Sequence, residues 1–343
     1  MARKTRDSVV VITGASSGIG RATALAFAEK GASVVLAARR AEALQEVATE
    51  CRTLGGRALV APTDVTDEED VEELARRAVE NFGRIDVWVN NAAVTLFGRF
   101  EETPSEVYRR VFETNLFGYI HGARGGFPYF REQGSGVLIN VSSVVAGAGQ
   151  PYTSAYVASK FAIRGLSECL RQELILDGAR DIHVCNVMPA SMDTLLFQHA
   201  ANYTGRAPKA LNPVYSAEKV AGAIVRCARR PKREVVVGSA GRMLAAQHTL
   251  SPGLYERAAA RVMDRDHFQD RAAPPTEGNL FVPMPGWTGA SGGWKTNGGG
   301  SARKALLAGA GVAVPVLLGW RWLRDGRASK NGIVARAASW RPG

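Results

Sequence analysis

Short apolar runs and helix-period segments alternate along the first 240 residues. The short runs are rich in valine and isoleucine, and the segments between them carry apolar residues at helical spacing. Strands that are apolar throughout and are separated by helices imply a parallel sheet that is covered on both faces. We therefore predict an α/β fold with a doubly wound sheet of about seven strands. The predicted strands are 8–13, 33–38, 57–61, 85–90, 136–141, 182–188 and 234–237, and the predicted helices are 19–30, 41–54, 68–82, 105–133, 155–176 and 217–228.

The pattern changes beyond residue 240, which divides the chain into further segments. A catalytic domain is predicted at 7–240, followed at 241–272 by an extension that looks helical and mixed in charge. Prolines and glycines crowd the next stretch, which indicates a linker at 273–301. Beyond it, residues 305–320 contain no charged side chain, so we predict an anchor helix at 302–323 and a basic tail at 324–343.

The apolar stretch raises the question of a membrane. Its sixteen residues would reach about 24 Å as a helix, against a hydrocarbon core of roughly 30 Å. A spanning helix, a helix lying in the interface and a soluble docking helix therefore stay open. Tryptophans at one end and basic residues at the other favour an anchor, although spanning would export a basic tail. The N-terminus lacks the apolar region of a signal peptide, so the catalytic domain is expected to face the cytoplasm. Together with the predicted anchor, this gives the membrane as the expected location.

A net charge of +11 is typical of a nucleic-acid-binding protein, but the distribution of the charge along this chain argues against that function. Residues 301–343 hold eight basic side chains and one acidic side chain, so most of the excess belongs to the tail. The body shows no basic stripe or motif that reads a duplex, and no nucleic-acid partner is expected. Four cysteines lie far apart with no Cys-x-x-Cys and no paired histidine spacing, so no metal site is expected either.

A glycine-rich loop links the first predicted strand to the first predicted helix. It reads Thr13-Gly14-Ala15-Ser16-Ser17-Gly18-Ile19-Gly20. Glycines in such a loop permit a tight turn and let backbone amides approach a pyrophosphate at the helix N-terminus. A glycine cluster can also be a plain turn, but the strand-loop-helix context favours a dinucleotide cofactor.

The residues at the end of the second predicted strand indicate which dinucleotide the site binds. A site that reads a free ribose 2′-hydroxyl places a carboxylate there, whereas this chain has Arg39 and Arg40. Arg39 can pair with a 2′-phosphate, which predicts NADP(H); the alternative is a solvated helix start. Asp64 and Val65 follow the third strand, near the expected adenine position, where Asp64 could equally serve as a helix cap.

Tyr156 and Lys160 lie four residues apart, thirteen residues after Ser143. On a helix, positions i and i+4 share one face, so the phenol and the ammonium can converge. A phenol pKa of roughly 10 makes tyrosine a poor acid-base group at neutral pH. A neighbouring cation lowers that pKa, and a serine hydroxyl could then polarise a substrate carbonyl. On its own, such a pair is also common on solvated helix faces.

Taken together, these motifs resemble the short-chain dehydrogenase/reductase family, of the single-domain Rossmann type. The loop at 13–20 matches the family's Thr-Gly-x-x-x-Gly-x-Gly, and Asn90-Asn91-Ala92-Ala93 matches Asn-Asn-Ala-Gly. Asn115, Ser143, Tyr156 and Lys160 follow in the family's order, and the resemblance covers about residues 7–240. Two departures are Ala93 and Ala190, where the family has glycine, and each adds a methyl beside a cofactor-facing loop.

The resemblance implies a role for each matching residue. Tyr156 would be the acid/base, Ser143 would steady the carbonyl, Lys160 would lower the Tyr156 pKa and hold the nicotinamide ribose, and Asn115 would bind a relay water. The cofactor-binding residues would be Gly14, Ser16, Ser17, Gly18, Ile19, Gly20, Arg39, Asp64, Val65, Asn91, Ala92, Tyr156, Lys160, Pro189 and Thr194. Ser142 competes with Ser143, but the spacing to Tyr156 favours Ser143.

The expected activity is NADP(H)-dependent hydride transfer between nicotinamide and a carbonyl or secondary alcohol. The predicted anchor suggests a lipid-like substrate. Phe197, Tyr203 and Tyr215 lie where the family has a substrate lid, and they could line an apolar site or merely pack the lid down. Family members often form dimers or tetramers through the helices containing Asn115 and Tyr156. The alternative function is a membrane-attached NADP-binding scaffold or redox sensor without turnover.

Overall fold

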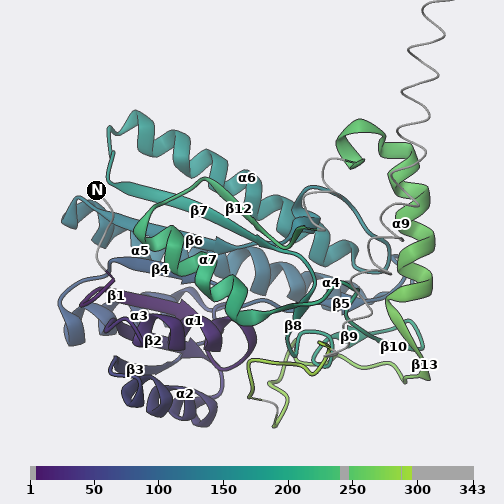
Figure 1. The fold of residues 1–343 in the computed structure, drawn as a ribbon, viewed down its shortest axis with the longest axis horizontal. Helices are drawn as coiled ribbons and strands as arrows, with labels where there is room; N and C mark the ends of the chain where they lie inside the picture. The colour runs from purple at the N-terminus through teal and green to yellow at the C-terminus, as the bar shows by residue number, and fades with distance from the viewer. Residues whose placement is uncertain (1–4, 240–246, 287, 296–343) are drawn as a thin grey trace, which may run out of the picture. The chain divides into compact units, whose positions relative to one another are not determined.

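A parallel sheet of seven strands, in the order β12-β7-β6-β4-β1-β2-β3, forms the centre of the molecule (Figure 1). The computed structural model describes residues 5–239, 247–286 and 288–295. The sheet strands are β1 (Val9–Thr13), β2 (Ser33–Ala38), β3 (Arg57–Pro62), β4 (Val87–Asn90), β6 (Gly136–Val141), β7 (Ile182–Pro189) and β12 (Glu234–Val237). The predicted α/β fold with a doubly wound, Rossmann-like sheet is confirmed.

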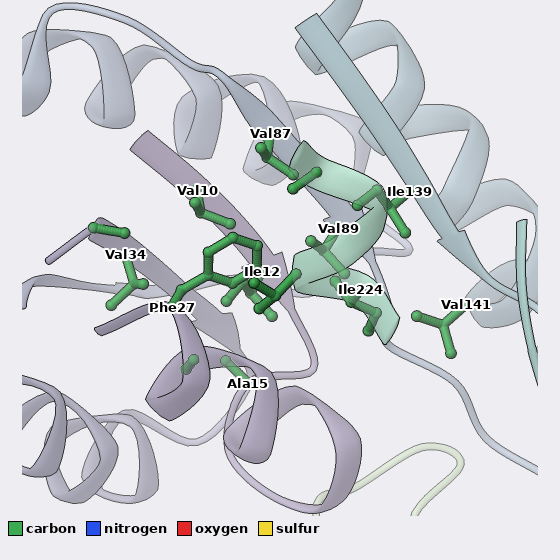
Figure 2. Close-up of a cluster of buried hydrophobic side chains, with 14 of the residues drawn as sticks. Val10, Ile12, Ala15, Phe27, Val34, Val87, Val89, Ile139, Val141 and Ile224 are labelled. Carbon is green, nitrogen blue, oxygen red and sulfur yellow. The ribbon is translucent and has the colours of Figure 1, made fainter. Parts of the chain in front are cut away.

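Alternate residues of β1 enter two separate cores. Val10 and Ile12 belong to one buried cluster, whereas Val9 and Val11 belong to the other. Successive side chains of a strand point to opposite faces, so a strand covered on both sides must be apolar throughout. Figure 2 shows the first cluster, in which Phe27 packs beside Ile12.

Helices cover both faces of the sheet (Figure 1). One layer consists of α1 (Gly18–Ala28), α2 (Ala41–Thr53) and α7 (Ala217–Arg229). The other layer consists of α3 (Glu68–Phe82), α4 (Ser105–Phe112), α5 (Gly118–Gln133) and α6 (Ser154–Leu176). Crossovers of this kind leave the carboxyl ends of the parallel strands along one edge, where their loops can form a site.

The region predicted as one helix at 105–133 is interrupted. A π-helical turn, η1 (Glu113–Phe117), separates α4 from α5. Hydrophobic periodicity does not register such a turn, because it inserts a single residue without breaking the helical path. Single π-turns inside helices are frequent at functional sites, and this one contains Asn115.

Short strands and a C-terminal helix complete the described part of the chain. The short strands are β5 (Leu96–Phe97), β8 (Met192–Asp193), β9 (Ala201–Asn202), β10 (Arg206–Pro208), β11 (Tyr215–Ser216) and β13 (Phe268–Ala272). Pro252 begins helix α9 (Pro252–Asp266) instead of only breaking a longer helix, because the first helical turn tolerates a residue without an N–H. Strand β13 then pairs with β10, which fastens the extension to the catalytic domain.

The predicted membrane location is corrected by the structure. Across residues 5–239, 247–286 and 288–295, no helix combines the length and apolar character needed to cross a bilayer. The sequence run behind that prediction covers only sixteen residues, fewer than the roughly 20 that a spanning helix needs. The predicted anchor at 302–323 and tail at 324–343 lie outside the described residues.

Candidate active site

The loops that follow β1, β4, β6 and β7 meet at one edge of the sheet. Asn90 at the end of β4 is in register with Asn140 of β6, and Asn140 is in register with Asn186 of β7. The glycine loop follows β1, Asn91 follows β4, Ser143 lies two residues after β6, and Pro189 ends β7. Tyr156 reaches the same edge from the first turn of α6, so residues far apart in sequence converge there.

The glycine positions of the loop are ones where a side chain would be strained or would clash. Gly14 and Gly18 have φ of 67° and 53°, a region that favours glycine. A Cβ added at Gly20 would lie 2.1 Å from the carbonyl oxygen of Gly14. Ser17, the N-cap of α1, makes no side-chain bond to the helix, and the Gly18 N–H donates outward to the carbonyl of Gly289 (3.1 Å). Free helix N–H groups beside a bare backbone fit the pyrophosphate of a dinucleotide.

Thr13 joins the glycine loop to the loop after β4. Its hydroxyl accepts hydrogen bonds from the backbone N–H groups of Asn91 (3.0 Å) and Ala92 (3.1 Å). The side-chain amide of Asn91 donates back to the Thr13 carbonyl at 2.9 Å. The two cofactor-facing loops therefore hold each other in place, and the role of Thr13 was not identified from the sequence.

Arg39 follows β2 and points toward the C-terminal part of the chain. Its guanidinium donates to the carbonyl oxygens of Asn279 (2.6 Å), Phe281 (3.1 Å) and Leu280 (3.3 Å). These carbonyls belong to residues 276–286 and 288–295, here called the strap, which lie within the region whose composition indicates a linker. The carbonyl oxygens occupy guanidinium donors that a phosphate would otherwise accept from, so they compete with a phosphate for Arg39.

Asp64 is held beside Arg39 by a second arginine. Its carboxylate accepts hydrogen bonds from the Thr66 hydroxyl (2.8 Å) and from Arg110 (3.1 Å). Burial raises the pKa of Asp64, but the Thr66 hydrogen bonds and the positive charge of Arg110 outweigh it, so the net pKa lies below its usual value. Val65 is buried, and its carbonyl meets the His121 ring at 3.0 Å.

Ser143, Tyr156 and Lys160 are brought together at the carboxyl end of β6. A hydrogen bond joins the side chains of Ser143 and Tyr156. The Lys160 ammonium nitrogen lies 5.4 Å from the centroid of the Tyr156 ring. Ser143 also lies 3.5 Å from the Pro189 carbonyl, whereas the hydroxyl of Ser142 points to the backbone carbonyl of Lys160 at 3.3 Å. This geometry favours Ser143 over Ser142 as the partner of the phenol.

Burial dominates the electrostatics of the pair. It raises the pKa of Tyr156 to about 12, although the Ser143 hydrogen bond opposes this. Burial also lowers the pKa of Lys160 to about 7. Both effects have one cause, since a low-polarity interior disfavours the phenolate and the ammonium alike. The effect of Lys160 on the Tyr156 pKa stays a prediction, and burial is the larger influence on that pKa.

Asn115 occupies the π-turn and is fully buried. Its side-chain oxygen accepts from the Val94 N–H (2.8 Å), and its side-chain nitrogen donates to the Val94 carbonyl (2.9 Å) and to the Ser159 hydroxyl (3.2 Å). The Asn115 side chain thus ties the loop after β4 to α6, on which Tyr156 and Lys160 lie. Because the side chain is engaged in these hydrogen bonds, the backbone of Asn115 is the part left to bind the predicted relay water.

Tyr119 is a site residue that the sequence analysis missed. It is 1% exposed, its hydroxyl donates to the Val141 carbonyl (2.8 Å), and it accepts from the Lys160 ammonium at 3.4 Å. The same carbonyl lies 3.1 Å from that ammonium. In the sequence, the feature that pointed to Tyr119 was its position four residues after Asn115. The π-turn between them obscures the helical spacing that would place both on one face.

A chain of buried amides lies behind the site. Asn90 donates to Asn140 (3.0 Å), Asn140 donates to Ser167 (2.9 Å), and Ser167 donates to Asn186 (2.7 Å). The three asparagines occupy one register across β4, β6 and β7, so they link three strands to α6. Buried polar groups persist in a core only when they are hydrogen-bonded in this way.

The loop after β7 accommodates the alanine that replaces glycine. The Ala190 N–H donates to the Val237 carbonyl (2.9 Å), and its methyl group packs against the first core cluster. Thr194 is buried and lies next to Gly18, since a Cβ added at Gly18 would be 3.4 Å from the Thr194 side chain. The loop after β7 therefore lies against the predicted pyrophosphate position at the start of α1.

The three aromatic residues of the predicted lid each pack against a different part of the fold. The Phe197 ring lies 6.4 Å from Phe97 and 5.8 Å from both His267 and Trp294, measured between ring centroids. Tyr203 packs against the cluster between β5 and α4. Tyr215 bonds through its hydroxyl to Ser239 at 3.1 Å. Within the described residues, these contacts favour a packed lid.

Solved structures resemble this fold. A short-chain dehydrogenase/reductase from Burkholderia phymatum, in complex with NAD, aligns with a TM-score of 0.66 and 25% identity over 74% of this chain and 97% of its own. An alcohol dehydrogenase from Thermococcus sibiricus, complexed with 5-hydroxy-NADP, aligns with a TM-score of 0.58 and 29% identity over 67% of this chain and 96% of its own.

Sequence comparison agrees with the structural likeness. The uncharacterized oxidoreductase YxnA of Bacillus subtilis is 39% identical over 277 residues, which is 80% of this chain and 78% of that protein. The family model for short chain dehydrogenases matches residues 8–205. Together with the seven-stranded sheet and the assembled tyrosine, lysine and serine, these matches show that the chain belongs to the short-chain dehydrogenase/reductase family of oxidoreductases.

Proposed function

We propose that this oxidoreductase uses NADP(H) to interconvert a carbonyl compound and the corresponding secondary alcohol. The observation that carries the proposal is the convergence of Ser143, Tyr156 and Lys160 beside the glycine loop. A scaffold that only binds a dinucleotide has no need of a buried phenol next to a buried amine, so an enzyme is the better reading of this site.

The residues divide the work as follows. The glycine loop and the N-terminus of α1 hold the pyrophosphate, and Lys160 lies where it can bond a ribose hydroxyl. When bound, the nicotinamide supplies or accepts the hydride. Ser143 donates to the substrate oxygen, and Tyr156 gives that oxygen a proton or takes one from it. With a pKa raised to about 12, Tyr156 is held in its protonated form and is suited to protonating a developing alkoxide.

Arg39 supports NADP(H) over NAD(H). Its position after β2 suits a 2′-phosphate, and no acidic residue occupies the positions next to it at the end of β2. Replacing Arg39 by alanine should raise the Kd for NADPH while leaving that for NADH nearly unchanged. Arg52, near the C-terminal end of α2, is exposed and provides the control as Arg52→Ala. An unaltered preference in Arg39→Ala would show that the 2′-phosphate is read elsewhere.

The substrate is proposed at the level of a carbonyl or secondary alcohol. The expectation of a lipid-like substrate rested on the predicted anchor, which lies outside the described residues.

Exchanging Tyr156 for phenylalanine tests the mechanism. With a panel of aldehydes and ketones, NADPH oxidation should fall by roughly 10²–10⁴-fold, the contribution of a positioned acid. Binding of NADPH, followed by its fluorescence, should persist. Tyr129→Phe is a matched control, because Tyr129 is a half-buried tyrosine on α5 outside the site. Full turnover by the Tyr156 variant would refute the assignment.

An oligomer is also proposed. Phe117 in η1 and Phe161 in α6 are 44% and 43% exposed, and they lie on the segments that family members use for assembly. Large apolar side chains left at a surface commonly mark a protein interface. A dimer or tetramer that buries these rings is consistent with their exposure.

A further inference from the structure

The strap runs along the edge of the sheet where the dinucleotide is expected. It starts at Thr276, which pairs with Asn202 of β9, and its first half meets Arg39 after β2. Its second half meets the N-terminus of α1 at Gly18 and then Asp193 after β7. In Figure 1 it is the yellow-green segment beside β8 and β9. Its contacts follow the predicted cofactor path from the adenosine end to the nicotinamide end.

Carbonyl oxygens of the strap bind donors that the proposed function assigns to phosphates. Arg39 donates to three of them, at 2.6–3.3 Å, where a 2′-phosphate is expected. The Gly18 N–H, at the pyrophosphate position, donates to the Gly289 carbonyl at 3.1 Å. Arg21, one turn further into α1, donates to the Thr288 carbonyl at 2.8 Å. The same donors cannot serve the strap and a dinucleotide at full strength together.

The strap is fastened at both ends. Leu280 is fully buried among residues of β5, α4 and α6. At the other end, Asp193 accepts from the Ser291 hydroxyl (2.6 Å) and from the N–H groups of Gly292 (3.1 Å) and Trp294 (2.7 Å). The contact is close, since a Cβ added at Gly292 would lie 2.2 Å from the Thr194 carbonyl oxygen.

We propose that the strap is an autoinhibitory segment, which occupies the phosphate-binding donors of the cofactor edge and is displaced when the dinucleotide binds. This inference rests on the proposed function. A neutral carbonyl is a weaker acceptor than a phosphate. At Gly18 a charge-assisted hydrogen bond, roughly twice as strong as a neutral one, would replace the bond to a carbonyl, and at Arg39 the phosphate would add the attraction between opposite charges. Exchange of carbonyls for phosphates therefore favours release, and the strap sets a threshold cofactor concentration without blocking the site permanently.

Hydrogen exchange of the wild-type protein distinguishes a displaced strap from a fixed wall of the site. The N–H groups of Gly292 and Trp294 are bonded to Asp193 and should exchange slowly without cofactor. Saturating NADPH should accelerate exchange in a peptide covering residues 288–295 at least tenfold. Slower or unchanged exchange would overturn the inference, because a wall that the cofactor packs against gains protection on binding.

Two variants loosen the strap at opposite ends. Leu280→Ala removes the buried anchor, and Gly292→Ala introduces the 2.2 Å clash. Gly165→Ala, on α6 and outside the strap, is the control, because nothing lies within 4 Å of its added Cβ. In stopped-flow measurements of NADPH fluorescence, the first two should bind NADPH several-fold faster and tighter than wild type, and the control should match wild type. Affinity that is equal or weaker in both loosened variants would overturn the inference.

The two proposals fail in different ways. If NADPH and NADH bind neither the wild type nor the loosened variants, the proposed function fails, and the inference about the strap fails with it. If NADPH binds all four proteins alike, only the strap inference fails. Turnover by Tyr156→Phe bears on the mechanism alone, since no strap residue contacts Tyr156 in a described hydrogen bond.

Discussion

The Lys160 ammonium nitrogen lies 3.4 Å from the hydroxyl oxygen of Tyr119, and both groups donate to the carbonyl of Val141. Burial keeps the pKa of Tyr119 well above its usual value, so this phenol stays protonated and cannot replace Tyr156 as the acid. Its effect on the site is to position Lys160 by accepting a hydrogen bond from the ammonium group.

Replacing Tyr119 by phenylalanine should therefore lower kcat by a little over tenfold with KM unchanged. The loss corresponds to about 1.5 kcal/mol, the lower range for a hydrogen bond to a charged group, because the distance is long. Losing an acceptor disfavours the ammonium, so the pKa of Lys160 should fall further and the alkaline limb of the pH–rate profile should move to lower pH. A profile identical to that of Tyr129→Phe would show that Tyr119 only fills space.

The stability of the protein should depend on pH through the same lysine. Its pKa is about 7 in the folded protein, against 10.5 for the ordinary side chain, so between these values the unfolded chain binds a proton that the folded protein lacks. The free energy of unfolding should then rise with pH from 7 to 10.5, by at most about 1.4 kcal/mol per pH unit. Urea titrations at several pH values measure this slope.

Lys160→Met should remove that rise, and its slope supplies the background from all other groups. Tyr156 acts in the opposite sense at higher pH. With its pKa raised to about 12, the folded protein keeps a proton that the unfolded chain loses above pH 10, so stability should fall between pH 10 and 12. A wild-type slope equal to that of Lys160→Met would refute the buried-lysine account.

Two glycine-to-alanine exchanges should differ in their effect, the first weakening NADPH binding and the second stabilising the fold. Gly20→Ala places a Cβ 2.1 Å from the Gly14 carbonyl oxygen, which must push the glycine loop away from its position. NADPH affinity should fall at least tenfold. Gly165→Ala lies on the exposed face of α6 with nothing within 4 Å, and it should raise the unfolding free energy by about 0.5–1 kcal/mol. Calorimetric titration and urea unfolding check the pair, and normal NADPH binding by Gly20→Ala would contradict the site.

The buried amide chain should contribute mainly to stability. Asn140→Ala removes two hydrogen bonds, to Asn90 and Ser167, and leaves their partners buried. The expected loss is roughly 2–4 kcal/mol in unfolding free energy, with kcat per folded molecule nearly unchanged. Asn81→Ala, which removes an exposed bond to the Arg77 carbonyl, should cost less than about 0.5 kcal/mol. Equal effects of the two variants would rule out a structural role for the chain of amides.

Assembly can be tested on α6 alone. Phe161→Glu should reduce the mass measured by light scattering, because a carboxylate would be buried in the interface. Leu176→Glu, at the other end of the same helix and 86% exposed, should leave the mass unchanged. A monomeric wild-type protein would remove the proposed oligomer.

Much of this protein follows from local sequence. The alternation of β-branched apolar runs with helical segments determined the sheet and its layers, because a strand buried on two faces must be apolar at every position. Spacing determined that Tyr156 and Lys160 share a helix face. Glycines at 14, 18 and 20 determined where the loop carries no side chain, because local steric limits act through the residues themselves.

Tertiary structure decided what contacts these residues. Tyr119 and Asn140 belong to no local motif; the fold brings Tyr119 of α5 to Lys160, and the register of β4, β6 and β7 sets Asn140 between Asn90 and Asn186. The net pKa of Tyr156 depends on burial, which no spacing encodes. The prolines and glycines of residues 276–295 indicated a linker, but their backbone carbonyls bind Arg39 and the start of α1, because a backbone acceptor can pair with any donor that the fold brings to it.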